Sequence, residues 1–380
     1  MPDDDSGGLV TTKRTPLHAV HERAGATFTD FAGFDMPVRY SSDLDEHHAV
    51  RTSAGLFDLS HMAEIEVEGP EAAAYLDYSL SNTVSILENG QAKYSLLLSE
   101  SGGIVDDLIV YRIEPEHYLI VANASNREPA VSALRERTRG FDVAVSDVSD
   151  DWALLAVQGP HALRILSATQ SVVPADSLDE LRYYRIQRAT LHGAPGFIAR
   201  TGYTGEDGFE LYAPVAQAEA LWQDLVDAGV GFDLTLCGLA CRDTLRLEAG
   251  MPLYGHELSL QTTPASAGFS RVVDHTKEDF VGKAQLSDAP EPARVLVGLR
   301  AEGRRAPRAE YPVIDPKTGD VVGEVTSGAL SPTLGYPIAM AFVDQAHSGI
   351  GSELAVDVRG QSLAVTVTPL PFYSRKKETS

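Results

Sequence analysis

The chain has 380 residues and a formal net charge of −23 at pH 7. It is longer than one hydrophobic core usually holds, and its negative field repels nucleic acid and anionic membranes. No apolar run approaches the roughly 18 residues that cross a bilayer, and the acidic N-terminus lacks the apolar region of a secretory signal. These features predict a soluble, cytoplasmic protein of two or three domains, with neither nucleic acid nor membrane as a partner.

The acidic excess also predicts a dependence on salt. Aspartate and glutamate together number 54, against 31 lysines and arginines. Screening at high ionic strength removes most of the repulsion between such charges. We therefore hypothesise a halophilic source, and we expect the melting temperature and the activity of the purified protein to rise as KCl is added. Full stability and activity in dilute buffer, measured by thermal denaturation and turnover, would contradict this hypothesis.

The first part of the chain predicts mixed helices and strands. We expect residues 1–14 to be disordered, and Thr15 to cap a helix that has Pro16 in its first turn and ends near Gly25. Next come a strand and turn over 27–40 and a polar helix over 43–53. Four strands and a final helix are then expected, over 63–68, 93–98, 104–112, 117–123 and 130–139.

A strand, a Gly-Pro break and an amphipathic helix occur twice, at Gly69-Pro70 and at Gly159-Pro160. The two copies would mark related halves of one α+β unit, although Gly-Pro after a strand is common enough to arise by chance. Beyond the second copy we expect strands and helices, with Gly250 ending the last helix. Their ranges are 183–192, 196–200 and 209–212 for the strands, and 216–228 and 238–248 for the helices.

The last quarter of the chain has a different pattern. Residues 265–295 are expected to form a connector with short strands. From Ala293 onward, short β runs are separated by Gly, Pro and Asp, which predicts an all-β barrel or sandwich. These runs cover residues 295–299, 321–326, 338–343, 354–358 and 363–369.

Two adjacent carboxylates, Asp106 and Asp107, lie inside the apolar run over 104–112. Neighbours on a strand point to opposite faces, so at least one of the two should point toward packed protein or a cavity. A carboxylate there needs a hydrogen-bond donor, a cation or a chemical role. The alternative is a strand edge or bulge at which both acids are partly wet.

The segment Gly202-Tyr203-Thr204-Gly205 is rich in glycine but lacks the Gly-Lys-Ser/Thr of a phosphate-binding loop, and a strand follows it. Glycines around Tyr203 would let the backbone approach a flat ligand, with the phenol ring as a stacking surface. Glu210, on the strand that leaves the loop, can accept two N–H bonds from an amino-heterocycle. The alternative is an ordinary hairpin turn with a tyrosine in the core.

The predicted helix over 238–248 places Arg242 and Arg246 four residues apart, on one face. The leucines between them indicate a partly buried face, and a buried arginine needs an anion. That anion is either a ligand or an acid of this chain. We expect Cys237 and Cys241 to be small buried residues rather than a disulfide or a metal site, and we expect no metal site at the histidines, which lack the spacing of a ligand set.

Six short motifs occur in an order and spacing that closely resembles the aminomethyltransferase, or T-protein, family of the glycine cleavage system. The resemblance runs from about Thr15 to Tyr373, and the combination is specific for folate-dependent aminomethyl- and methyltransferases, although each motif is weak alone. The motifs are Asp45–Arg51, Phe57–Met62, Asp106-Asp107, Gly202–Glu206, Arg242–Gly250 and Thr326–Pro332.

The resemblance implies an α+β fold shaped as a three-lobed cloverleaf. Two mixed subdomains with antiparallel sheets would surround a central folate channel, and a C-terminal all-β barrel would form the third lobe. We assign residues 1–270 to the folate-binding region and 290–380 to the barrel. Within the first region, about 1–55 with 145–270 would form one subdomain, and 56–144 the other.

The resemblance also implies an activity. The aminomethyl-dihydrolipoyl arm of a partner, the lipoylated H-protein, would pass its methylene group to tetrahydrofolate, the co-substrate, to give 5,10-methylenetetrahydrofolate and ammonia, without a metal. By this resemblance Asp107 faces the folate nitrogens as the catalytic carboxylate, Glu210 binds the pterin amino edge, Tyr203 contacts folate and Arg242 binds substrate. We add two pocket residues: Asn123, at a strand end near the Asp107 hairpin, and Tyr373, because a tyrosine near the C-terminus contacts the ligand in the family.

Two alternatives remain at this stage. A folate-dependent demethylase of a small N- or S-methyl compound would have the same folate site. A folate-binding accessory protein of iron–sulfur or RNA-modification pathways would carry a Lys-Gly-Cys signature where this chain has Arg-Leu-Glu-Ala-Gly at Arg246–Gly250. The absence of a cysteine near Glu248 counts against that second alternative.

Overall fold

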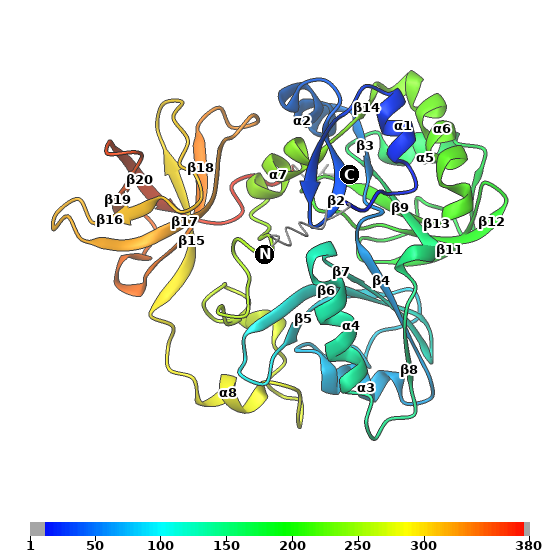
Figure 1. Cartoon of the computed structure of the whole chain (residues 1–380), viewed down its shortest axis with the longest axis horizontal. Helices are drawn as coiled ribbons and strands as arrows, with labels where there is room; N and C mark the ends of the chain where they lie inside the picture. The colour runs from blue at the N-terminus through cyan, green and yellow to red at the C-terminus, as the bar shows by residue number, and fades with distance from the viewer. Residues whose placement is uncertain (1–11, 376–380) are drawn as a thin grey trace, which may run out of the picture.

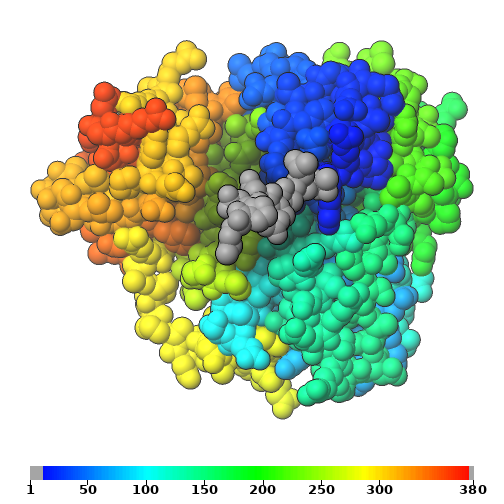
Figure 2. Space-filling view, in the orientation of Figure 1, coloured from blue at the N-terminus to red at the C-terminus, as the bar shows by residue number. Residues whose placement is uncertain are grey.

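Three lobes make up the computed structural model, which describes residues 12–375. One lobe is built on a seven-stranded sheet, one on a five-stranded sheet, and the third is a closed barrel (Figure 1). In the space-filling view the first lobe, in blue and green, packs on the second, in cyan and teal, while the barrel lies beside them in orange (Figure 2). The predicted α+β class with a C-terminal barrel is confirmed.

The seven-stranded sheet draws its strands from distant parts of the chain. Neighbouring strands are antiparallel, except that β14 runs parallel to β3. Apolar side chains of this sheet pack with the helices around Trp222 in one core. In sheet order the strands are β10 (Val172–Pro174), β11 (Ile186–Leu191), β12 (Ala194–Ala199), β13 (Gly208–Pro214), β9 (Trp152–Gln158), β3 (Ala54–Asp58) and β14 (Leu234–Leu236).

Helices and a separate hairpin complete this lobe. The α7 helix ends where Gly250 takes a φ of +66°, as its glycine predicts. The buried Cys237 and Cys241 are not bonded to each other. The remaining elements are α1 (His18–Arg23), α2 (Asp43–Thr52), α5 (Ala162–Ala168), α6 (Ala218–Gly229) and α7 (Leu239–Glu248), with the hairpin of β1 (Thr27–Phe31) and β2 (Phe34–Arg39).

The five-stranded sheet is the meander that the sequence predicts, extended by two strands. All its neighbours are antiparallel. Its strands, in sheet order, are β5 (Ala92–Leu98), β6 (Ile104–Glu114), β7 (His117–Ala122), β4 (Ala63–Glu68) and β8 (Ala144–Asp147), and its helices are α3 (Ala72–Ser79) and α4 (Arg127–Glu136). The predicted limits of the subdomains, at residues 55/56 and 144/145, stay a prediction. Both limits fall within strands: β3 of the seven-stranded sheet runs on to Asp58, and β8 of the five-stranded sheet begins at Ala144.

The repeated strand, Gly-Pro and helix unit is present in both places. Gly69 joins β4 to α3 with a φ of +142°, and Gly159 joins β9 to α5 with a φ of +130°. A Cβ at Gly69 would lie 2.3 Å from the carbonyl oxygen of Asp142, and one at Gly159 would lie 2.6 Å from that of Ser53. Each turn therefore needs glycine, because its φ is positive and because the backbone of another segment lies too close to leave room for a side chain.

The C-terminal lobe is a closed barrel of six strands, which decides between barrel and sandwich. Its strands, in barrel order, are β15 (Arg294–Ala301), β18 (Pro337–Asp344), β17 (Val321–Leu330), β16 (Pro312–Ile314), β19 (Glu353–Asp357) and β20 (Ser362–Thr368). The short β16 was missed because it has only three residues. The prediction of short strands in the connector is wrong: residues 265–293 contain a 3-10 turn (Ser270–Val272) and α8 (Lys283–Asp288).

The structure contradicts two predictions for the N-terminal segment. Residues 1–11 of the segment expected to be disordered lie outside the described residues, but Lys13 pairs with β2 at Phe34, so that expectation is wrong there. Thr15 is not a helix cap, because α1 begins at His18 and the Thr15 hydroxyl donates to Asp58, 2.7 Å away.

No helix in residues 12–375 combines the length and apolar character needed to span a membrane.

Candidate functional site

A cavity of about 520 Å³ lies where the first two lobes meet. Strands β6 and β7 line it from the five-stranded lobe, and the glycine-rich loop, β13 and α7 line it from the seven-stranded lobe, together with the segment from Gly250 to His256. The volume falls in the range typical of sites for small molecules. Every lining residue precedes Ser270, so the barrel adds no side chain to the wall among the described residues.

Asp107 faces this cavity from β6, an inner strand of the five-stranded sheet. Its Oδ2 accepts a hydrogen bond from the Tyr94 hydroxyl at 2.9 Å, and its Oδ1 accepts one from the Asn123 amide at 2.8 Å. Burial raises the pKa of Asp107. Because β6 lies between β5 and β7 and Asp106 is fully buried, the alternative of two wet acids at a strand edge is wrong.

Glu210 and Asn123 also line the cavity. Glu210, on β13, accepts a hydrogen bond from the Thr201 hydroxyl, and burial raises the pKa of the Glu210 carboxyl. Asn123 follows the last residue of β7, Ala122, and its side-chain amide lies against the Asp107 carboxylate. The structure thus brings Asp107, Glu210 and Asn123 from two lobes to one hollow.

Tyr203 and Arg242 form an aromatic and cationic wall of the same hollow. The Arg242 guanidinium lies 4.8 Å from the centre of the Tyr203 ring, and the Tyr203 hydroxyl donates to the carbonyl of Pro252. No carboxylate within residues 12–375 forms an ion pair with Arg242, whereas Arg246 pairs with Asp243 and with Glu257. The internal ion pair considered for this helix is therefore correct for Arg246 and wrong for Arg242, whose charge borders the cavity.

The chain matches two family models in succession. The GCVT N-terminal domain covers residues 17–277, and the glycine cleavage T-protein C-terminal barrel domain covers residues 294–374. The chain belongs to the glycine cleavage T-protein family.

Relatives within the T-protein family match along nearly the whole chain. An aminomethyltransferase of Cutibacterium acnes is 56% identical over 97% of this chain and 100% of its own length. One from Streptomyces avermitilis is also 56% identical, over 96% of this chain and 98% of its own length. The crystal structure of glycine cleavage system aminomethyltransferase T from Bartonella henselae matches with a TM-score of 0.89 at 38% identity, over 95% of this chain and 98% of that one.

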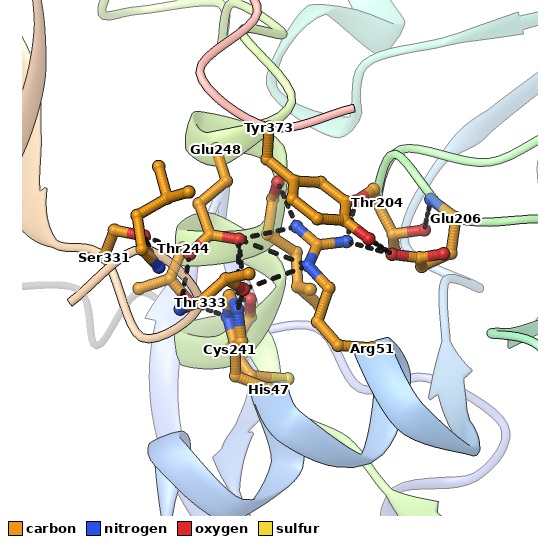
Figure 3. A network of polar contacts seen from close by, with 12 residues as sticks. His47, Arg51, Thr204, Glu206, Cys241, Thr244, Glu248, Ser331, Thr333 and Tyr373 are labelled. Atoms are coloured by element: carbon orange, nitrogen blue, oxygen red, sulfur yellow. Dashed lines mark hydrogen bonds and ion pairs between the residues drawn. The ribbon is translucent and has the colours of Figure 1, made fainter. Parts of the chain in front are cut away.

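Five of the six predicted site residues line the cavity of this T-protein family member, and Tyr373 does not. Its ring lies 4.1 Å from the Arg51 guanidinium carbon, and its hydroxyl donates to Glu206 at 2.7 Å. Figure 3 shows Tyr373 among polar residues that connect α2, α7 and the glycine-rich loop. The structure therefore places Tyr373 in a supporting network behind the loop.

Sequence reasoning missed much of the aromatic lining. Tyr94, Tyr111 and Tyr184 all border the cavity, and so does the buried His61, whose pKa burial lowers to about 4. The alternation of a strand could have identified Tyr111, because residues 107, 109 and 111 share one face of β6. Tyr184 and His61 come from other parts of the chain, and only the tertiary fold brings them there.

Proposed function

We propose that this chain transfers the methylene group of the aminomethyl-dihydrolipoyl arm of a lipoylated H-protein to tetrahydrofolate, in the cytoplasm. One observation carries the proposal: one aromatic hollow is lined by Arg242, which forms no ion pair within residues 12–375, and by two carboxyls of raised pKa, Asp107 and Glu210. Relatives named aminomethyltransferase that match the whole length support it.

The cavity residues fit tetrahydrofolate. A reduced pterin has a flat ring with an edge of N–H donors, and Glu210 can accept from that edge while Tyr203 offers a ring for contact. The cavity volume of about 520 Å³ suits a ligand of this size. Tetrahydrofolate supplies the nucleophile of the reaction, its N5 nitrogen.

The proposed role of Asp107 follows from charge and position. The transferred carbon loses its bond to the amine nitrogen and then its bond to sulfur, while bonds to N5 and N10 form. The two protons that leave N5 and N10 are carried away by ammonia and by the released thiol. An ionised carboxylate beside this centre stabilises its transient positive charge and accepts a proton during the transfer. Asn123 and Tyr94 hold that carboxylate in place.

Glu210→Ala is expected to weaken tetrahydrofolate binding. Loss of a charged hydrogen-bond acceptor costs about 1.5–3 kcal/mol, which corresponds to a dissociation constant about 10- to 150-fold higher. Isothermal titration calorimetry would measure this constant. Glu219→Ala is the matched control, because Glu219 is an exposed acid on α6 of the same lobe, outside the cavity lining, and its variant should bind within about twofold of wild type. An unchanged constant for Glu210→Ala would remove Glu210 from the folate site.

A demethylase would share the folate site, so the donor substrate must be tested directly. We expect methylene transfer from aminomethylated H-protein to tetrahydrofolate and no demethylation of small N- or S-methyl compounds. The 56% identity to aminomethyltransferases favours this outcome. Turnover of small methylated donors without turnover of the H-protein substrate would assign the chain to the demethylases.

A further inference from the structure

Asp106 lies behind the cavity wall, and the proposed function assigns it no role. Its side chain is fully buried and points away from the hollow that Asp107 faces, as expected for neighbours on one strand. Three donors converge on its carboxylate: the Asn123 backbone N–H at 3.0 Å, the Asn123 side-chain amide at 2.7 Å and the Asn126 side-chain amide at 2.7 Å. No lysine or arginine within residues 12–375 forms an ion pair with Asp106, so these three donors hold its carboxyl in place.

Asn123 joins the two acids. Its side-chain Nδ2 lies 2.7 Å from Oδ1 of Asp106, 2.8 Å from Oδ1 of Asp107 and 3.1 Å from the Asp107 carbonyl oxygen. Two hydrogens are therefore shared among three acceptors. Because Asp106 also holds the Asn123 backbone N–H, it fixes both ends of the residue that orients the Asp107 carboxylate.

We propose that Asp106 is a positioning residue of the transfer reaction: it fixes Asn123 and, through Asn123, the orientation and charge state of Asp107. This inference rests on the proposed role of Asp107. Burial and the charge of Asp107 raise the pKa of Asp106 to about 8, so Asp106 is largely uncharged where Asp107 ionises. Its influence passes through the Asn123 amide, whose hydrogen bond favours the ionised form of Asp107.

The phenols near the pair do not titrate in the same range as Asp107, whereas Glu210, whose pKa burial also raises, lines the same cavity from β13. Four tyrosines face the pair from other elements: Tyr94 on β5, Tyr184 before β11, Tyr203 in the glycine-rich loop and Tyr254 after α7. Burial raises the pKa of each phenol. They therefore stay neutral where Asp107 gains or loses its proton.

The test is the pH profile of the full-length enzyme with aminomethylated H-protein and tetrahydrofolate. We expect Asp106→Asn to lower kcat about 10- to 100-fold with little change in the KM for tetrahydrofolate. A misplaced Asn123 amide no longer favours the ionised form of Asp107, so the acid limb of kcat should also move to higher pH. In an Asp107→Asn background, Asp106→Asn should cause no further loss, because its effect passes through Asp107.

Asn126→Leu is a milder variant for the case in which Asp106→Asn folds poorly. It removes one of the three donors that hold Asp106 without touching Asp107, so Asn123 is held less firmly, and kcat and the acid limb should move in the same directions by less. Asp58→Asn is the matched structural control. Asp58 is also buried and has three donors, Thr15, His21 and Ser60, but it does not line the cavity. Its loss should lower the melting temperature without moving the acid limb.

The outcomes separate this inference from the proposed function. Wild-type kcat and an unmoved acid limb in both Asp106→Asn and Asn126→Leu, at equal folded fraction by circular dichroism, would overturn the positioning role. Near-normal turnover of Asp107→Asn alone would instead overturn the proposed role of Asp107.

Discussion

Asp107→Asn is expected to lower turnover by about two to four orders of magnitude, while the fold and the affinity for tetrahydrofolate stay close to wild type. Asparagine keeps the shape of the side chain and one oxygen acceptor for the Asn123 amide, but it cannot carry the negative charge or take a proton. Single-turnover kinetics with aminomethylated H-protein would measure the loss, and calorimetry would measure the folate affinity.

The pH dependence of turnover is a second expected result for Asp107. Burial raises the pKa of Asp107 above its ordinary 3.8, so the ionised fraction falls as the pH drops through the raised value. Turnover should therefore fall on the acid side in wild type, and the Asn variant should lack that limb.

Asp147→Asn serves as the control for Asp107→Asn. Asp147 is a partly buried acid of the same sheet that pairs with Arg127 at 2.8 Å and lies outside the cavity lining. Its turnover should stay within about twofold of wild type, as is usual for substitutions away from a site. Turnover of Asp107→Asn that matches this control would remove Asp107 from the mechanism.

The predicted site residues that line the cavity have a local signal in the sequence. Asp107 is one of two adjacent acids inside an apolar strand, and the resemblance to the T-protein family, rather than the pattern, selects it over Asp106. Tyr203 and Glu210 lie in and after a glycine-rich loop that leads into a strand. All three line the cavity. Periodicity also predicted α7 and its end at Gly250, because a helix and its C-terminal glycine are specified within a few residues.

The errors share the opposite property, since each depends on residues far apart in the chain. Thr15 has the residue type of a helix cap, but its hydroxyl bonds to Asp58, 43 positions away. Tyr373 has the residue type of a ligand contact, but Arg51 and Glu206 hold it outside the cavity. Long-range partners decided both cases, and local sequence carries no signal for them.

The largest expected loss of stability also depends on such long-range partners. Glu248, the last residue of α7, is fully buried and accepts hydrogen bonds from α2 and from the barrel loop (Figure 3). Arg51 donates to it at 2.8 Å, the Thr333 hydroxyl at 2.7 Å, the Thr333 backbone N–H at 2.9 Å, and the Ser331 hydroxyl donates as well. One carboxylate thus connects the barrel to the lobe that carries the cavity.

Glu248→Ala is expected to lower the free energy of unfolding by about 3–5 kcal/mol, because it removes one of the two carboxylates that pair with the buried Arg51 guanidinium and leaves the Ser331 and Thr333 donors without an acceptor. Chemical denaturation followed by circular dichroism would measure the loss. Asp344→Ala is the matched control: it breaks the exposed Arg294–Asp344 pair of the barrel and should cost less than about 1 kcal/mol. Equal losses in the two variants would contradict the role of Glu248.

Acid should reproduce the effect of Glu248→Ala. Burial alone would raise the pKa of Glu248, but hydrogen bonds from His47 and Ser331 and the charge of Arg51 lower it to about 2, against 4.5 for an unperturbed glutamate. Because the folded-state pKa is the lower one, this contribution is complete above about pH 4.5 and is lost as the pH falls toward 2. Stability measured across that window should fall less steeply in Glu248→Ala than in wild type.

Loss of Glu248 should also reach the cavity. Gly250 and Met251, which follow Glu248 by two and three residues, line the hollow, and Arg51 donates to the Thr204 carbonyl beside Tyr203 at 2.7 Å. Glu248→Ala should therefore weaken tetrahydrofolate binding although Glu248 does not line the cavity. Glu248→Gln keeps an oxygen acceptor for Ser331 and Thr333 but lacks the charge that holds Arg51, so its stability and its folate affinity should lie between those of wild type and Glu248→Ala. Wild-type folate affinity in Glu248→Ala, at equal folded fraction, would show that Glu248 does not support the cavity.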